Sequence, residues 1–280
     1  MAASEVTDPA DPRVTDYLQL GDRVLRSRPD DPASGPRGRF IAEGDLVIAR
    51  ALDAGLEPLS VLAAPERLSA LPRLPPTTAV LVAGPAILEA ITGFHVHRGL
   101  LASFRRPPER SPATTLEDAR RVVVAVGVAD PTNLGAMIRS AVALGIDTLL
   151  LDERSCDPLY RRSVKVSMGT VFDLPWARIG SPAEGFAHLA KRGFMIAALT
   201  TDPGAVDVAD LASTPRLALV VGNERHGLPV AVAAAADVVA TIPMRAGVDS
   251  LNAAAAMAVA AYAVTRGVER AVPLHDGVRA

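Results

Sequence analysis

The sequence predicts an α/β protein with a mostly parallel sheet in its C-terminal half and a smaller α/β domain before it. Segments 122–128 and 217–221 are continuous apolar runs of strand length, the pattern of strands buried on both faces of a parallel sheet. Between residues 131 and 144 apolar residues recur at helical spacing, and a further apolar strand follows at 148–151. This strand, helix, strand order is a βαβ unit.

The predicted βαβ unit places two polar side chains at one edge of the sheet. Asp130-Pro-Thr-Asn133 has turn chemistry and opens the helix, which Gly145 ends. A right-handed crossover brings Asn133 and Arg139 near the carboxyl ends of the strands, where open α/β folds bind ligands. Arg139 lies off the apolar stripe of the helix, so it is a candidate functional residue.

Two later segments also place polar residues after strands. The strand at 217–221 runs into Gly222 and Glu224, and an apolar stretch beginning at Ile242 leads through a polar turn to an Ala-rich helix at 253–264. Ser250 and Asn252 lie where side chains cap helices. Each feature alone is compatible with an ordinary cap or a solvated carboxylate. Together they favour a ligand site at the carboxyl edge.

The amino-terminal part predicts a separate small domain. Residues 38–44 lead into a helical pattern to about 54 and a strand at 59–62, and a second strand, helix, strand pattern covers 79–82, 85–91 and 99–103. With 280 residues the chain exceeds the usual single domain of ~100–200 residues. We place the boundary between the two predicted domains in the Pro- and Arg-rich segment 105–115.

Composition excludes several classes of protein. The single Cys156 rules out an intramolecular disulfide and fits a reducing compartment, and the absence of a Cys/His cluster predicts no metal. The start has no secretory signal pattern, and the helix at 253–264 is shorter than the ~18 apolar residues of a membrane span, so we expect a cytoplasmic protein. Neither a dinucleotide-binding nor a P-loop glycine motif is present.

The charge pattern is compatible with an RNA partner without requiring one. The net charge is −2, yet the cations are 27 arginines and 2 lysines, and arginine makes bidentate phosphate contacts. Arg-biased codon usage explains the total equally well. Local clusters are more informative, and Arg120 with Arg121 is one of them. The cationic residues that we predict to contact RNA are Arg39, Arg105, Arg106, Arg161, Arg162 and Lys165.

Four segments in order resemble the TrmH/SpoU family of S-adenosylmethionine-dependent RNA ribose 2′-O-methyltransferases, within the knotted SPOUT class. They are Asp130-Pro-Thr-Asn133 through Arg139, Lys165 through Pro175, Gly222-Asn-Glu224-Arg-His-Gly227, and Ile242 through Asn252. The resemblance spans roughly residues 120 to 268. Residues 38–103 resemble, less specifically, the L30e-like substrate-binding domain that many members carry.

The resemblance implies a fold and a set of boundaries. It implies a SPOUT α/β trefoil-knot domain at 120–268 with a mostly parallel sheet, preceded by an L30e-like α/β/α domain at 18–108 and a linker at 109–119. Residues 1–17 and 269–280 are expected to be tails, and 29–38 a loop. A homodimer is implied, and the small, apolar helix at 253–264 suits packing in a core or against a second subunit.

The resemblance also assigns roles to residues. Arg139 lies at the 2′-hydroxyl, where the family's proposed mechanism makes it the base. A guanidinium stays protonated, so we prefer stabilisation of the developing alkoxide, with the proton leaving to phosphate or water. The other residues implied to orient the reactants are Asn133, Glu224, Ser250 and Asn252. Residues implied to contact S-adenosylmethionine, largely through backbone groups, are Leu199, Thr200, Gly222, Ile242, Met244 and Leu251.

The expected activity is therefore methylation of a ribose 2′-hydroxyl in RNA. Ribosomal RNA, in particular 23S rRNA, is favoured over transfer RNA because of the L30e-like domain. Three alternatives stay open: a tRNA 2′-O-methyltransferase, a base methyltransferase of the same knotted class, and a non-catalytic RNA-binding relative in ribosome assembly.

Overall fold

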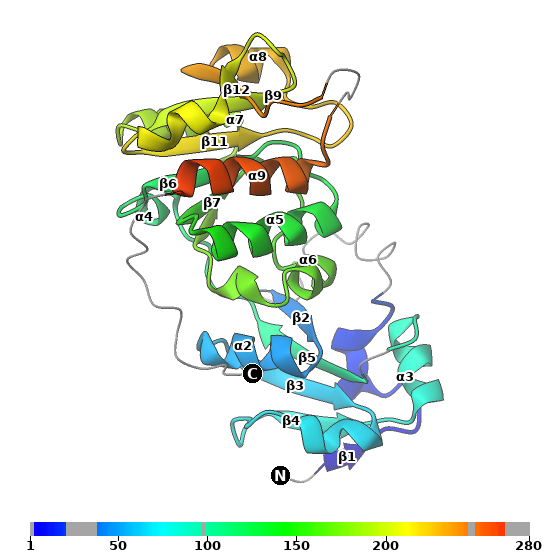
Figure 1. Ribbon diagram of the computed structural model, residues 1–280. Helices are drawn as coiled ribbons and strands as arrows, with labels where there is room; N and C mark the ends of the chain where they lie inside the picture. The colour runs from blue at the N-terminus through cyan, green and yellow to red at the C-terminus, as the bar shows by residue number, and fades with distance from the viewer. Residues whose placement is uncertain (1–2, 21–37, 97–98, 246–249, 267–280) are drawn as a thin grey trace. The chain divides into compact units, whose positions relative to one another are not determined.

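The computed structural model describes residues 3–20, 38–96, 99–245 and 250–266 (Figure 1). The chain divides into two compact units, which are described separately. The first unit comprises Met1–Glu109, Asp130–Arg139 and Cys156–Asp173, and the second comprises Arg110–Ala129, Ser140–Ser155 and Leu174–Ala280. Helix α5 (Pro131–Leu144) is continuous and contributes residues to both units.

The first unit contains a five-stranded sheet in the order β1-β4-β3-β5-β2. Strand β4 pairs in parallel with β1 and β3, whereas β5 is antiparallel to β3 and β2. The strands are β1 (Ala3–Glu5), β2 (Arg39–Glu43), β3 (Pro58–Ala63), β4 (Ala79–Val82) and β5 (Leu100–Arg105). The helices are α2 (Asp45–Asp53), α3 (Pro85–Thr92), α6 (Arg161–Val166) and the 3-10 turns at Pro12–Tyr17, Pro65–Ala70 and Thr170–Phe172. The strands and helices expected between residues 38 and 103 are confirmed.

The prediction of an N-terminal tail at residues 1–17 was wrong. Strand β1 pairs with β4, and Val14 and Tyr17 are fully buried in the core of the first unit. The Tyr17 hydroxyl hydrogen-bonds the Ser60 hydroxyl at 2.8 Å and accepts from the Ser103 backbone N–H at 3.2 Å. Burial raises the pKa of Tyr17 above its usual range. A polar, three-residue strand leaves little sequence signal, because its partner strand determines its conformation.

The second unit contains a seven-stranded sheet in the order β10-β12-β9-β11-β6-β7-β8, and every pairing is parallel. The strands are β6 (Arg121–Ala125), β7 (Thr148–Leu151), β8 (Trp176–Arg178), β9 (Met195–Thr200), β10 (Val206–Asp207), β11 (Leu217–Val221) and β12 (Val238–Thr241). The helices of this unit are α4 (Pro112–Thr115), α7 (Pro182–Ala190), α8 (Val230–Ala234), α9 (Ala253–Thr265) and the 3-10 turn Val208–Ser213. The mostly parallel α/β fold predicted for the C-terminal half is confirmed.

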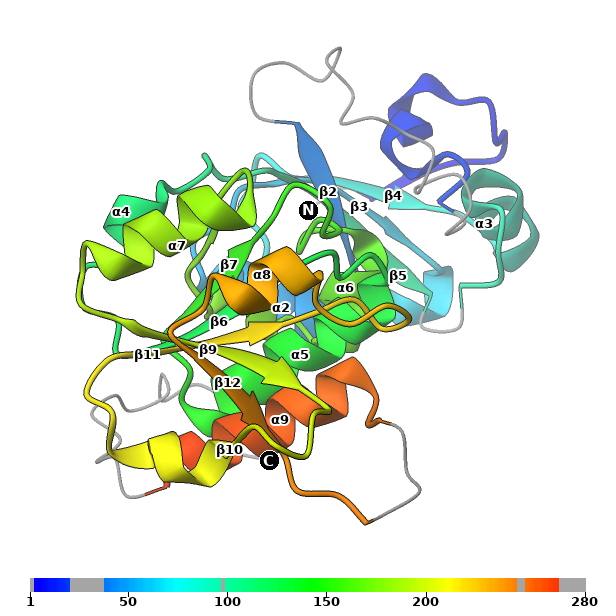
Figure 2. The same ribbon diagram turned by 90° about the horizontal axis from the view of Figure 1, so that it is seen from above.

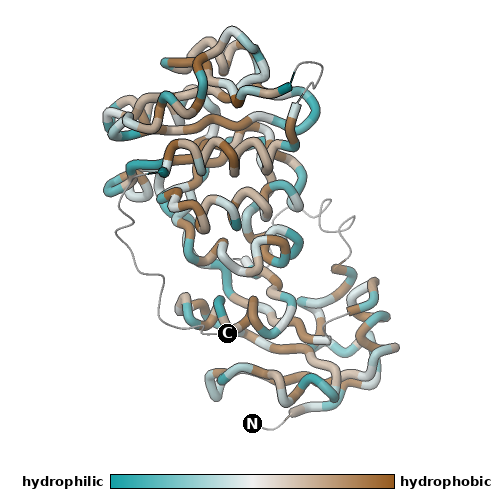
Figure 3. The backbone as a smooth tube through the Cα atoms, viewed as in Figure 1, coloured by the Kyte–Doolittle hydropathy of each residue, from teal (hydrophilic) through white to brown (hydrophobic). Residues whose placement is uncertain are grey.

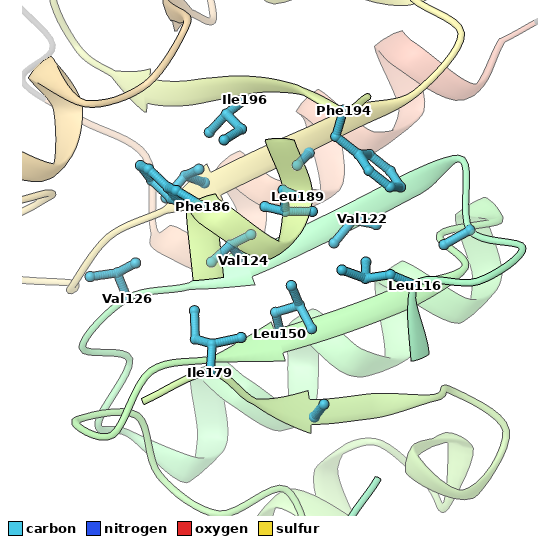
Figure 4. Close-up of a cluster of buried hydrophobic side chains, with 14 residues drawn as sticks. Leu116, Val122, Val124, Val126, Leu150, Ile179, Phe186, Leu189, Phe194 and Ile196 are labelled. Atoms are coloured by element: carbon cyan, nitrogen blue, oxygen red, sulfur yellow. The ribbon is translucent and has the colours of Figure 1, made fainter. Parts of the chain in front are cut away.

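Alternate residues of each central strand enter different cores. Ala218 and Val220 of β11 join the cluster around Phe186 of α7, which Figure 4 shows, while Leu219 joins a second cluster with Val264 of α9. Successive side chains of a strand point to opposite faces, so α7 and α9 cover opposite faces of the sheet (Figure 2). Both faces are apolar, which explains why these strands are continuously hydrophobic in the hydropathy colouring of Figure 3.

Several predicted boundaries differ from the structure. The expected linker at 109–119 contains α4, and Leu116 is fully buried in the core beside α7. Strand β12 ends at Thr241, so Ile242 follows the strand. The expected C-terminal tail at 269–280 and most of the loop expected at 29–38 lie outside the described residues.

Arg121 is a buried residue that hydrogen-bonds backbone carbonyls, and it does not belong to an exposed cationic cluster. Only 6% of the residue is exposed, and its guanidinium donates to the carbonyls of Val264 and Ala212 at 3.1 Å and of Pro215 at 3.2 Å. Burial lowers the pKa of this guanidinium. Arg121 donates to carbonyls at the end of α9 and in the segment before β11, so its guanidinium is turned into the protein and away from solvent.

Candidate ligand-binding site

Three neighbouring strands of the second unit end at one edge of its sheet. Strand β9 lies between β12 and β11, and the register pairs Thr241 with Thr200. Leu199 and Thr200 are half-buried at the end of β9, Gly222 follows β11, and Ile242 follows β12. The structure therefore brings four of the residues predicted to contact a cofactor to one edge, where parallel α/β sheets bind ligands. Met244 follows on the same loop as Ile242 and is half-buried.

The loop after β11 is folded back on itself at Gly222. A Cβ atom at Gly222 would lie 2.4 Å from the Leu228 backbone nitrogen and 2.4 Å from the Gly227 carbonyl carbon. The backbone groups of Asn223 and Gly227 exchange two hydrogen bonds, at 3.1 and 2.9 Å. Only glycine permits this approach of backbone to backbone, so the requirement for Gly222 is steric.

Asn223 fixes the same loop and was missed by the sequence reasoning. Its side-chain amide donates to the Gly127 carbonyl at 2.7 Å, and its side-chain oxygen accepts from the backbone N–H groups of Arg225 at 2.9 Å and His226 at 3.2 Å. Asn223 thereby ties the loop after β11 to the loop after β6. Its neighbour Glu224, a predicted site residue, is half-buried on this loop.

A second network missed by the sequence reasoning holds the loop after β6. One carboxylate oxygen of the buried Asp152 accepts from the Gly127 backbone N–H at 2.9 Å and from the Ser155 hydroxyl at 2.7 Å. The Ser155 hydroxyl oxygen in turn accepts from the Val128 N–H at 3.1 Å. Asp152 and Ser155 both follow β7. Two polar residues directly after a predicted strand were the sequence pattern from which this network could have been predicted.

At the start of α9 the two predicted site residues Asn252 and Ser250 have different surroundings. The Asn252 side-chain oxygen accepts from the Ala254 N–H at 3.0 Å and the Ala255 N–H at 3.3 Å, which makes Asn252 the N-cap. Ser250 is exposed and precedes the cap by two residues. Leu251 is 39% exposed, a large exposure for a leucine. The turn at 246–249 lies outside the described residues.

Asn133 and Arg139 lie on the part of α5 that belongs to the first unit. Asn133 is half-buried and Arg139 is exposed. The Asp130 carboxylate accepts from the Thr132 N–H at 2.6 Å, a capping interaction at the first turn, and Pro131 stands at the start of the helix. The predicted start of the helix after Asp130 is confirmed, and the roles of Asn133 and Arg139 stay predictions.

The cations predicted to contact RNA differ in their surroundings. Arg39 pairs with Asp16 and Arg105 with Glu57, and both arginines are about half-exposed. Arg106 and Arg161 instead pair with buried carboxylates, and Arg161 is only 8% exposed. Arg162 donates to the Thr132 hydroxyl at 2.9 Å, and Lys165 pairs with Glu43 at 2.5 Å. The RNA role of this set stays a prediction, and the more exposed members are its better candidates.

A small cavity of about 130 Å³ lies in the first unit. Arg67 lines it, and the Arg67 Nε atom is buried without an acceptor among the described residues. The other lining residues are Ala64, Glu66, Pro85, Leu88, His95, Val96 and Gly99.

Among the residues that the structure describes, no three His, Cys, Asp or Glu side chains are grouped as metal ligands would be. Cys156, the single cysteine of the sequence, is half-buried and forms no disulfide. Within the same described ranges no helix has the length and hydrophobicity needed to cross a bilayer.

The fold and the edge define a class of protein: a parallel α/β protein whose ligand-binding loops follow adjacent strands. Residues 120–262 match the SpoU rRNA methylase family, and the chain belongs to this family. An uncharacterized tRNA/rRNA methyltransferase of Mycobacterium bovis is 38% identical over 94% of this chain and 91% of its own length.

Solved structures agree with this membership. An AdoMet-bound rRNA methyltransferase from Sinorhizobium meliloti aligns with a TM-score of 0.76 and 27% identity, covering 95% of this chain and 98% of that one. An RNA 2′-O ribose methyltransferase aligns with a TM-score of 0.73 and 29% identity over the same shares. The resemblance recognised in the sequence is confirmed.

Proposed function

We propose that this protein transfers a methyl group from S-adenosylmethionine to a ribose 2′-hydroxyl of RNA. The observation that carries the proposal is the edge formed by the ends of β12, β9 and β11, within the segment that matches the family. The Sinorhizobium neighbour holds AdoMet, and the second neighbour is a 2′-O ribose methyltransferase.

The residues at this edge fit S-adenosylmethionine. Half-buried Leu199 and Ile242 and the exposed Leu251 would offer apolar surface to the cofactor, and the backbone of Gly222 would offer hydrogen bonds. When bound, S-adenosylmethionine supplies an electrophilic methyl group on a positively charged sulfur. Thr200 and Met244 complete the proposed contacts.

The chain's own residues would position the ribose and stabilise its charge. The guanidinium of Arg139 remains protonated, so it would bind the adjacent phosphate and stabilise the oxyanion as the hydroxyl loses its proton to phosphate or water. Asn133 and Glu224 would orient the ribose and the loops. Ser250 would contribute a hydroxyl contact, and Asn252 would act by fixing the start of α9. Holding the reactants in near-attack geometry supplies most of the acceleration.

The substrate that we propose is ribosomal RNA, in particular 23S rRNA, with tRNA as the alternative. The solvent-accessible cations Arg39, Arg105, Arg162 and Lys165 would contact the phosphate backbone. Neutralising the cations should weaken RNA binding and reduce its dependence on salt.

We also propose a homodimer that uses the outer face of α9. Val259 and Tyr262, one turn apart on this helix, are 44% and 53% exposed. Tyr262→Glu should convert the dimer to a monomer in light scattering, and a wild-type monomer at micromolar concentration would contradict the proposal.

Methyl-labelled S-adenosylmethionine and total RNA from a strain lacking the gene provide the test. Label in an alkali-resistant dinucleotide would support 2′-O-methylation and identify the RNA. Label on a base would favour a base methyltransferase, and cofactor binding without transfer to any RNA would favour a non-catalytic role in ribosome assembly.

Arg139→Ala tests the proposed mechanism. We expect loss of methyl transfer with unchanged S-adenosylmethionine affinity, because the proposed cofactor contacts lie elsewhere in the chain. Arg73→Ala is the matched control, since Arg73 is an exposed arginine outside the family motifs. Near-normal turnover of Arg139→Ala would refute the assigned role.

A further inference from the structure

Glu43 is a buried carboxylate that joins two segments distant in sequence. It ends β2, its side chain is fully buried, and it pairs with Arg161 and Lys165 of α6, 118 and 122 residues later. The Lys165 ammonium lies 2.5 Å from one carboxylate oxygen, and Arg161 binds the other. A buried carboxylate is costly unless it is paired, so these contacts tie α6 firmly to the sheet of the first unit.

Helix α6 in turn holds the first turns of α5. The Ser163 hydroxyl donates to the Pro131 carbonyl at 3.1 Å, and Arg162 donates to the Thr132 hydroxyl at 2.9 Å. A Cβ atom at Gly135 would lie 2.7 Å from the Ser163 carbonyl oxygen, so the two helix backbones are in direct contact. These contacts leave the first turns of α5 little freedom to shift along α6.

We propose that Glu43 is a positioning residue for methyl transfer. The carboxylate sets the position of α6, and α6 sets the start of α5, the helix that carries Asn133 in its first turn and Arg139 in its third. The five-stranded sheet and the part of α5 that carries Arg139 belong to one compact unit. The effect on catalysis rests on the proposed function. The structural coupling from Glu43 to α5 does not depend on that function.

Other contacts keep α6 and its neighbours folded without Glu43. Arg106 pairs with the buried Asp157 at 2.6 Å, and Arg50 donates to the Met168 carbonyl at 2.8 Å. Phe40 packs against Phe172, with ring centroids 5.6 Å apart. Loss of the Glu43 charge should therefore shift α6 rather than unfold the unit.

The test uses full-length Glu43→Gln, which keeps the shape of the side chain and removes its charge. We expect backbone amides in the first turns of α5 to exchange hydrogen faster than in the wild type, because α6 no longer restrains them. We expect kcat to fall about tenfold or more through misplacement of Arg139, with RNA KM and S-adenosylmethionine affinity changed less than about twofold. Asp11→Asn, which removes the charge of a carboxylate paired with the half-exposed Arg13, is the control and should change none of these.

Hydrogen exchange separates this inference from the proposed activity. Faster exchange in α5 supports the coupling even if the protein methylates a base or nothing at all. Unchanged exchange in α5, or unchanged kcat in an enzyme shown to methylate RNA, would overturn the positioning role. If Glu43→Gln does not fold, Lys165→Met offers the hydrogen-exchange part of the test, since Lys165 is 37% exposed and its loss leaves Glu43 paired with Arg161.

Discussion

Gly135→Ala should destabilise the protein even though alanine is the better helix former. The new methyl carbon would lie 2.7 Å from the Ser163 carbonyl oxygen and 2.9 Å from the Val166 Cβ atom, and neither is the end of a flexible side chain. Overpacking of this kind costs ~1–3 kcal/mol. Helix propensity returns ~0.5–1 kcal/mol. The steric cost exceeds the gain, and the net loss is about 1 kcal/mol.

A loss of this size lowers Tm by about 2–4 °C in a chain of this length. Differential scanning calorimetry measures it, with Gly204→Ala as the control, because a Cβ atom at Gly204 would meet only the Asp202 carboxylate, at 3.3 Å. A higher Tm for Gly135→Ala than for the wild type would show that α5 and α6 separate readily, and would refute the close packing. The rate of methyl transfer to RNA should fall as well, because α5 must shift to make room for the alanine side chain at position 135.

Three further predictions concern the loops and caps of the second unit. Asn252→Ala should cost about 0.5–2 kcal/mol in chemical denaturation by removing the cap of α9, while Ser250→Ala changes stability by less than about 0.5 kcal/mol. Gly222→Ala should weaken S-adenosylmethionine binding about tenfold or more in calorimetry, because its Cβ atom would displace the backbone at Leu228. Hydrogen bonds from Ser181 hold the pKa of the Glu184 carboxyl below its usual value, so the stability it adds is complete above that value and is lost as pH falls through the folded pKa. The Tm difference between wild type and Glu184→Ala should therefore be larger at pH 7 than at pH 3.

The buried elements of the second unit could be predicted from the sequence. The apolar run at 217–221 coincides with β11, and the helix expected after Asp130 ends at Leu144, before Gly145. Strands covered on both faces have a continuous hydrophobic pattern, and glycine ends a helix by its backbone freedom. Both patterns are local in the sequence, so they can be recognised without knowing which other segments pack against the strand or the helix. The trefoil knot stays a prediction, because threading of a chain has no local signal.

The features that sequence reasoning missed depend on partners distant in the chain. β1 is a strand because β4 pairs with it, and Arg121 is buried because α9 ends beside it. Glu43 and Arg161 find each other across 118 residues. The sequence does not show whether an arginine is paired with a buried carboxylate or exposed to solvent. Composition alone therefore could not separate structural cations from candidate RNA contacts.

The position of β6 in its sheet has a consequence for synthesis on the ribosome. β6 pairs with β11, which begins at Leu217, and Arg121 at its start donates to Val264, 143 residues later. The first strand of the second unit therefore emerges long before its neighbour on that side and before the helix that accepts its guanidinium. Contacts so distant in sequence make folding slow. A nascent chain that stops before α9 leaves the apolar face that α9 covers exposed to solvent, and such a face favours aggregation until α9 is made.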